Sequence, residues 1–202
     1  MQNKYTIMSD IFARESLSIA KYEPNKVANG LNHATFFVAS DDIDVVDLQR
    51  YREQTKTEYL IAIKTSNKYF NCLNIADNII ECLPNEIELV VAGLEYMAKN
   101  WGFIGMDWQD ITTAISSRRN IQFIQSYAVG ENCVSKASDE IVLKLHQIKS
   151  DERLAAVLIN TFGGEDFDFG EFEIITTKTQ SNLNIAPENM VYQISFCRSE
   201  ER

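Results

Sequence analysis

Apolar segments with strand-like and helix-like spacing alternate in the first half of the chain, and this alternation restricts the fold more than any other feature. Short apolar runs at 34–39 and 58–64 predict buried strands. Residues 42–54, between them, have the apolar spacing of a helix. Residues 70–83 carry apolar groups at i, i+3, i+4 and i+7, which predicts a second helix that Pro84 ends. This order predicts an α/β fold with a partly parallel sheet.

Two further helices are predicted around these segments. Residues 9–22 are expected to form a short helix capped by Ser9. Residues 86–100 have a full apolar face and predict a long helix that could join two domains rigidly. We therefore divide the chain into an N-terminal α/β region, 1–85, and a C-terminal domain, 86–202, that includes the connecting helix.

The C-terminal part has a sharper pattern, which predicts an α+β sheet packed against helices. Residues 110–119 predict a short helix, another helix begins after Gly130, and residues 167–180 fit either a helix or a strand. We expect three strands, at 120–129, 155–162 and 190–197, to lie in one sheet. The side chains expected to be buried are Cys133, Leu143, Leu145, Val157, Ile159, Tyr192, Ile194 and Phe196.

Charge and composition exclude several classes of function. The 202 residues carry a formal net charge of -10, which repels the phosphate backbone of nucleic acids. No apolar run is long enough to span a membrane, and the N-terminus lacks the apolar core of a secretory signal, so we expect a cytoplasmic protein. The four cysteines are too far apart for a metal site and are expected to be buried free thiols; no cofactor is expected.

Four segments of the C-terminal part resemble, in order and spacing, the C-terminal domain of FtsZ, the tubulin-like cell-division GTPase. They are GLEYMAKNWGFIGMDWQDI, GENCVSKASDEI, AAVLINTFGGEDFDFGEFE and LNIAPENMVYQISFC. The resemblance covers about residues 86–198 and implies the mixed sheet and packed helices of that domain in the FtsZ/tubulin superfamily.

The same resemblance implies a site in the loop after the connecting helix. FtsZ carries an Asn-x-Asp-x-x-Asp pattern there, and the loop reaches the nucleotide of the neighbouring subunit. Here the matching positions are Gly105, Asp107 and Asp110, so both carboxylates are present and the Asn is absent. The resemblance thus implies Asp107 and Asp110 as catalytic residues, and Gly105, Asp107, Trp108 and Asp110 as partner-binding residues. Acidic residues in the first turn of a helix are equally explained by capping and the helix dipole.

FtsZ binds GTP through a glycine-rich phosphate loop, which this chain lacks. Its first 100 residues contain only Gly30 and Gly93, far apart. Residues 1–85 are therefore either a reduced remnant of a GTPase domain or an unrelated domain. We expect a pseudo-GTPase that binds an FtsZ-like or tubulin-like GTPase, or itself, and caps or regulates filaments in cell division. The alternatives are a self-assembling scaffold of FtsZ-like fold and a small-molecule enzyme that uses Asp107 and Asp110.

Overall fold

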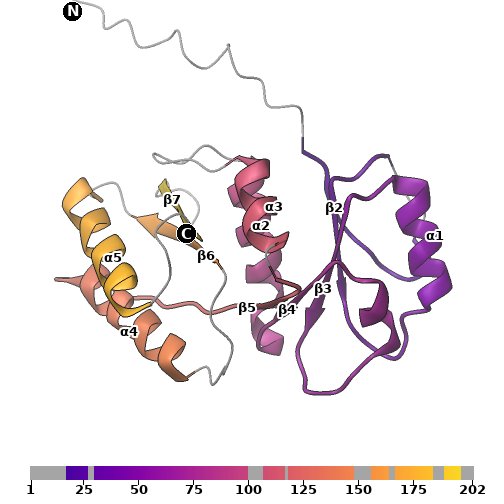
Figure 1. Ribbon diagram of the computed structural model, residues 1–202, viewed down its shortest axis with the longest axis horizontal. Coiled ribbons are helices and arrows are strands. Elements are labelled where there is room, and N and C mark those ends of the chain that lie inside the picture. The colour runs from indigo at the N-terminus through magenta and orange to yellow at the C-terminus, as the bar shows by residue number, and fades with distance from the viewer. Residues whose placement is uncertain are drawn as a thin grey trace, which may run out of the picture.

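The computed structural model describes residues 17–26, 30–99, 107–116, 118–147, 156–163, 167–183 and 189–196. These residues form a five-stranded sheet, a separate two-stranded sheet and the helices packed against them (Figure 1). The elements, in order, are β1 (Ile19–Lys21), β2 (Ala34–Val38), α1 (Val45–Thr55), β3 (Tyr59–Lys64), the 3-10 helix η1 (Asn71–Ile75), β4 (Asn78–Glu81), the 3-10 helix η2 (Pro84–Glu86), α2 (Ile87–Lys99), α3 (Trp108–Ser116), β5 (Asn120–Gln122), α4 (Cys133–Gln147), β6 (Val157–Gly163), α5 (Phe169–Asn182) and β7 (Met190–Phe196).

The larger sheet has the order β1-β2-β3-β4-β5, and each strand pairs in parallel with its neighbours. Its centre is buried on both faces, and Leu60 and Ile61, which point to opposite faces of β3, are both almost fully buried. The α/β class is confirmed, as are the strands predicted at 34–39 and 58–64 and the helices predicted at 42–54 and 86–100. All strand pairings among the described residues are parallel rather than mixed.

Helices cover both faces of this sheet. One core joins α1 and η1 to Phe37, Leu60 and Ala62, and the other core joins α2 and α3 to the opposite face through Phe36 and Ile61. The crossovers β2–α1–β3 and β4–α2–α3–β5 step in the same direction across the sheet but over opposite faces (Figure 1). They therefore have opposite handedness, although about 98% of such crossovers in proteins are right-handed. The strand that follows the second crossover, β5, is a short edge strand of 3 residues.

Two predicted helices are wrong. The segment 70–83 forms η1 and then the strand β4, because Ile79 and Ile80 point to opposite faces of the sheet and both are buried there. A strand buried on both faces shows no alternation, so its apolar residues can match helical spacing by chance. The predicted helix over 9–22 overlaps β1 at Ile19–Lys21, and residues 9–16 lie outside the described residues.

The C-terminal part contains the smaller sheet, in which β6 and β7 pair in parallel from Val157↔Met190 to Gly163↔Phe196. The expectation of one sheet for 120–129, 155–162 and 190–197 is wrong, because β5 pairs with β4 instead and only 120–122 of its segment form a strand. The ambiguous segment 167–180 forms α5, which begins with a reciprocal cap between Asp168 and Glu171. Figure 1 shows α4 and α5 side by side on one side of the small sheet.

The predicted burial of the C-terminal side chains is mostly wrong. Leu143 is 58% exposed. The side chains of Cys133, Leu145, Val157, Ile159 and Tyr192 are half-buried, and those of Ile194 and Phe196 lie outside the described set. Residues two apart on a helix point in nearly opposite directions, so Leu143 and Leu145 cannot share one buried face. In α4 the face turned inward includes Val134, Ser138 and Ile141 instead.

Candidate functional site

The two carboxylates implied by the sequence resemblance meet at the start of α3. The Asp110 N–H donates to Asp107 Oδ1 at 2.8 Å, and the Asp107 N–H donates to Asp110 Oδ2 at 3.0 Å. This is a reciprocal cap, in which each carboxylate satisfies a backbone N–H that has no partner within the helix. Both side chains are exposed to solvent. The helix dipole favours negative charge at this end.

The cap uses only one oxygen of each carboxylate, Asp107 Oδ1 and Asp110 Oδ2, as a hydrogen-bond acceptor. No further protein partner of either carboxylate is seen among the described residues. The second oxygen of each group is thus available to order a water or to contact an external group. Capping and an outward role are compatible in this geometry.

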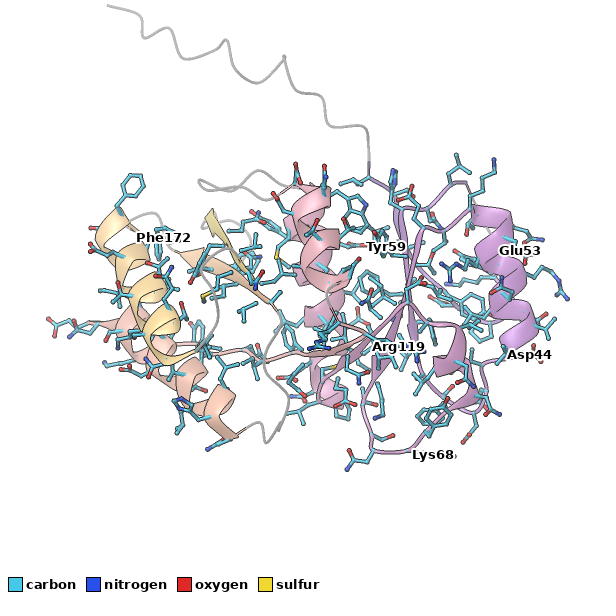
Figure 2. All side chains as sticks on the ribbon, viewed as in Figure 1. Asp44, Glu53, Tyr59, Lys68, Arg119 and Phe172 are labelled. Atoms are coloured by element: carbon cyan, nitrogen blue, oxygen red, sulfur yellow. The ribbon has the colours of Figure 1, made fainter. Side chains whose placement is uncertain are left out.

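Trp108 fixes the start of α3 against the sheet. Its half-buried ring meets Tyr59, the first residue of β3, edge to face with centroids 5.8 Å apart. Tyr59 lies between the sheet and α3 (Figure 2). Leu17 and Ile19 pack in the same core. Trp108 is therefore placed to support the Asp107–Asp110 cap, and a partner could contact only part of its ring.

The other end of α3 is held by Asn78, the first residue of β4, a role that sequence reasoning missed. The buried Asn78 side chain donates from Nδ2 to the carbonyl oxygens of Ile115, at 2.7 Å, and Arg118, at 3.1 Å. No local sequence signal marks this role, because the two partners of Asn78 lie 37 and 40 positions along the chain. With Trp108 on Tyr59 and Asn78 on Ile115, α3 lies across the amino ends of β3 and β4.

The opposite, carboxyl end of the sheet is acidic. There, β2 leads through Ser40–Asp44 into α1, and Asp44 caps that helix: its Oδ1 accepts from Val46 N–H at 2.7 Å and from Asp47 N–H at 3.0 Å. Figure 2 shows Asp44 and Lys68 toward this end of the molecule, away from Tyr59. A shallow depression of about 430 Å³ lies here, lined by Ser40, Asp41, Asp42, Ile43, Asp44, Val45, Val46 and Asn71.

The lysines at this acidic edge are already paired. Lys68 forms an ion pair with Asp41, and Lys64 forms one with Glu81 at 2.8 Å. Each pair neutralises one lysine and one carboxylate, so neither lysine adds net positive charge that would attract an anionic ligand to the carboxyl end of the sheet. The edge therefore keeps its negative character.

A second depression, of about 500 Å³, lies at the amino ends of β3 and β4 and includes Arg118 and Arg119 in its lining. Arg119 is occupied, because its guanidinium donates to the carbonyl oxygens of Leu73 and Ala76. Neither depression includes Asp107 or Asp110. Gly105 lies outside the described residues, as does Cys197. Cys72 and Cys82 are buried free thiols, as expected, whereas Cys133 is a free thiol that is only half-buried. Within the described ranges, no cluster of His, Cys, Asp and Glu could hold a metal ion.

Among the described residues, no helix is both long and apolar enough to cross a membrane.

No protein-family model and no curated protein sequence matches the chain. Two solved structures of FtsZ from M. jannaschii resemble it. A Trp-to-Tyr mutant of FtsZ matches with a TM-score of 0.58 and 13% identity, covering 83% of this chain and 62% of the FtsZ chain. An empty FtsZ dimer matches with a TM-score of 0.54 and 12% identity, covering 83% and 59%.

These matches extend the likeness beyond the segments that first suggested it. Because 83% of the chain is covered, part of the N-terminal region must take part in the superposition as well. The chain spans about 60% of the length of the FtsZ structures, which have 62% and 59% of their residues covered. Identity this low reports on the fold alone. The chain therefore has an FtsZ/tubulin-like fold.

Proposed function

We propose that this chain is an FtsZ-like protein without a GTP site of its own, which docks on an FtsZ-like or tubulin-like GTPase and caps or regulates its filaments. The observation that carries the proposal is the contrast between two opposite ends of the molecule. One end presents the Asp107–Asp110 cap, and the other presents the acidic β2–α1 edge.

The acidic edge argues against a bound nucleotide. In open α/β sheets, ligands bind beyond the carboxyl ends of the strands, and phosphates bind to the free N–H groups at a helix N-terminus. At α1, the N–H groups of Val46 and Asp47 already donate to Asp44. The neighbouring Asp42 adds negative charge beside the same depression, whereas Asp41 is paired with Lys68. A triphosphate would lose hydrogen bonds and meet repulsion there.

The cap at α3 supports the docking half of the proposal. Head-to-tail assembly extends only while each subunit presents both of its unlike surfaces. A subunit that offers the α3 end but no nucleotide can join a filament in one direction and gives the next subunit nothing to bind. The free carboxylate oxygens of Asp107 and Asp110 would lie against the neighbour's nucleotide, where they could orient the attacking water.

The experiment uses the FtsZ-like GTPase of the same cell. We expect substoichiometric amounts of the full chain to shorten its filaments in electron microscopy, and the isolated chain to show no micromolar affinity for GTP in calorimetry. Unchanged filament length and unchanged GTP turnover would refute docking. Micromolar GTP binding would refute the interpretation of the β2–α1 edge.

A matched pair of variants separates chemistry from helix capping. The double substitution Asp107→Ala with Asp110→Ala removes the reciprocal cap of α3, and Asp168→Ala with Glu171→Ala removes the equivalent cap of α5. Any stimulation of GTP turnover should disappear in the first variant and persist in the second. Equal loss in both variants would mean that stability, not the carboxylates at α3, controls the effect.

A further inference from the structure

One arginine at the amino end of the larger sheet has no partner among the described residues. Four arginines lie in the described ranges, and three of them, Arg50, Arg52 and Arg119, each donate to a carboxylate or a carbonyl oxygen. The exposed guanidinium of Arg118 forms no hydrogen bond or ion pair within those ranges. In a chain with a formal net charge of -10, a cation without a carboxylate partner is unexpected.

The main chain at Arg118 is nevertheless held on both sides. The Arg118 carbonyl oxygen accepts from Asn78 Nδ2 at 3.1 Å, and the Arg119 carbonyl oxygen accepts from the Ile79 N–H at 2.8 Å. Both donors belong to β4. An arginine whose main chain is already fixed loses only side-chain freedom when it binds, so Arg118 is partly prepared for a partner.

Arg118 lines the depression of about 500 Å³ at the amino ends of β3 and β4, together with Ser116, the last residue of α3. Glu58 lines the same depression from the β3 side and forms no ion pair with Arg118. Strand β4 lies between β3 and β5, so two strand spacings, about 9.6 Å, separate the main chains of Glu58 and Arg118. The guanidinium therefore remains available to a group from outside the chain.

The depression and the Asp107–Asp110 cap lie at the two ends of α3. The helix has 9 residues, from Trp108 to Ser116, and at 1.5 Å per residue it is about 13 Å long. Both features face the same end of the molecule, because α3 lies across the amino ends of β3 and β4. A protein interface of ordinary size, about 800 Å² on each partner, would cover both of them.

Docking at this end needs a compensating cation. The docking proposed above brings the carboxylates of Asp107 and Asp110 toward the phosphates of a neighbour's nucleotide, and like charges across an interface oppose association. The chain as a whole adds a net charge of -10. Of the four described arginines, Arg118 can offset this repulsion without giving up a contact inside the chain.

We propose that Arg118 pairs with a carboxylate on the protein surface of the docked GTPase and is a second anchor of the docking face; this inference rests on the proposed function. The arginine fork matches a carboxylate through two parallel N–H···O bonds. About 13 Å of helix separates Arg118 from the cap that would face the nucleotide. The anion is therefore assigned to the neighbour's protein surface rather than to its phosphates.

The test compares two substitutions that change the net charge equally. Arg118→Glu alters the free guanidinium, and Asn78 keeps its contact because every residue has a carbonyl oxygen. Arg50→Glu is the matched control, since Arg50 is an exposed arginine on α1. Co-sedimentation of each full-length chain with filaments of the FtsZ-like GTPase from the same cell gives an apparent dissociation constant.

We expect Arg118→Glu to weaken binding by about tenfold or more, and Arg50→Glu to weaken it by less than about twofold. Arg118→Lys keeps the charge but not the fork, so its affinity should fall between those of the parent and Arg118→Glu. Alanine substitutions at acidic residues of the partner's docking face should then identify the carboxylate. Its loss should weaken binding of the parent chain and have no further effect on Arg118→Ala.

Three results would overturn the inference. Equal binding of Arg118→Glu and Arg50→Glu would remove the role of Arg118 and leave the docking itself intact. A parent chain that does not sediment with the filaments would refute the docking, and the anchor with it. A urea midpoint clearly lower for Arg118→Ala than for Arg50→Ala would show that the guanidinium is already used within the chain.

Discussion

Asp107 and Asp110 satisfy each other's backbone N–H groups, with contacts of 2.8 and 3.0 Å. The same reciprocal arrangement recurs at the start of α5, where the Glu171 N–H donates to Asp168 Oδ1 at 2.9 Å and the Asp168 N–H donates to Glu171 Oε2 at 3.3 Å. Two acidic residues three positions apart are thus a general helix start in this chain. At α3 we propose that the same pair also faces a neighbouring subunit, as the sequence resemblance to FtsZ implies.

Loss of the α3 cap should lower stability by a predictable amount. Asp107→Ala leaves the Asp110 N–H without its acceptor. We expect the free energy of unfolding in urea to fall by about 1 kcal/mol, and Asp107→Asn, which keeps an acceptor oxygen, to lose less. Asp168→Ala at α5 is the control and should cost a similar amount. An Asp107→Ala protein as stable as the parent would show that the cap contributes nothing in solution.

Replacing Asn78 should lower the stability of the protein markedly. Asn78→Ala removes the buried donor that serves both the Ile115 and the Arg118 carbonyl oxygens. Leaving buried acceptors unsatisfied costs about 1–3 kcal/mol, and we expect a loss of that size in urea unfolding, with faster hydrogen exchange in α3. Asn74→Ala is the matched control, because Asn74 is exposed. Equal effects of the two substitutions would contradict the role assigned to Asn78.

Asn78 also shows why part of the fold and of the site escaped prediction. The sequence predicts α1, β2 and β3 correctly because each has a single strong period flanked by turn or cap residues. It fails at β4, where Ile79 and Ile80 are buried on opposite faces and the spacing of a helix arises by coincidence. The contact from Asn78 to Ile115 spans 37 positions. No local pattern records a partner so distant, whereas the Asp107–Asp110 cap is local and its spacing is visible.

The two buried thiols should make the protein less stable in alkali. Burial raises the pKa of the Cys72 thiol and of the Cys82 thiol above the ordinary value of 9.0. Between the ordinary and the raised pKa, the unfolded chain has lost the thiol proton and the folded chain still holds it. The free energy of unfolding therefore falls as the pH rises above about 9. The raised pKa of Tyr22, also caused first by burial, acts in the same direction above its ordinary 10.0.

Urea midpoints measured from pH 7 to pH 10 check this dependence. Cys72→Ala with Cys82→Ala should flatten the alkaline decline, even though the cavities lower stability at every pH. The slope, rather than the absolute stability, is the quantity to compare. A slope that is the same in the parent and in the double variant would assign the alkaline loss to other groups.

The contact between Tyr96 and Phe162 should couple the connecting helix α2 to the small sheet. Their rings meet edge to face with centroids 5.1 Å apart, and Phe162 is 46% exposed, so the contact lies at the surface of the junction. A double-mutant cycle with Tyr96→Leu and Phe162→Leu should give a coupling of about 0.5–1.5 kcal/mol in urea unfolding, because paired aromatic rings add that much beyond the area they bury. A second cycle is the control and combines Tyr96→Leu with Tyr69→Leu, because the Tyr69 ring is exposed. It should give a coupling within about 0.5 kcal/mol of zero. If the first cycle were also near zero, these two rings would not hold β6 against α2.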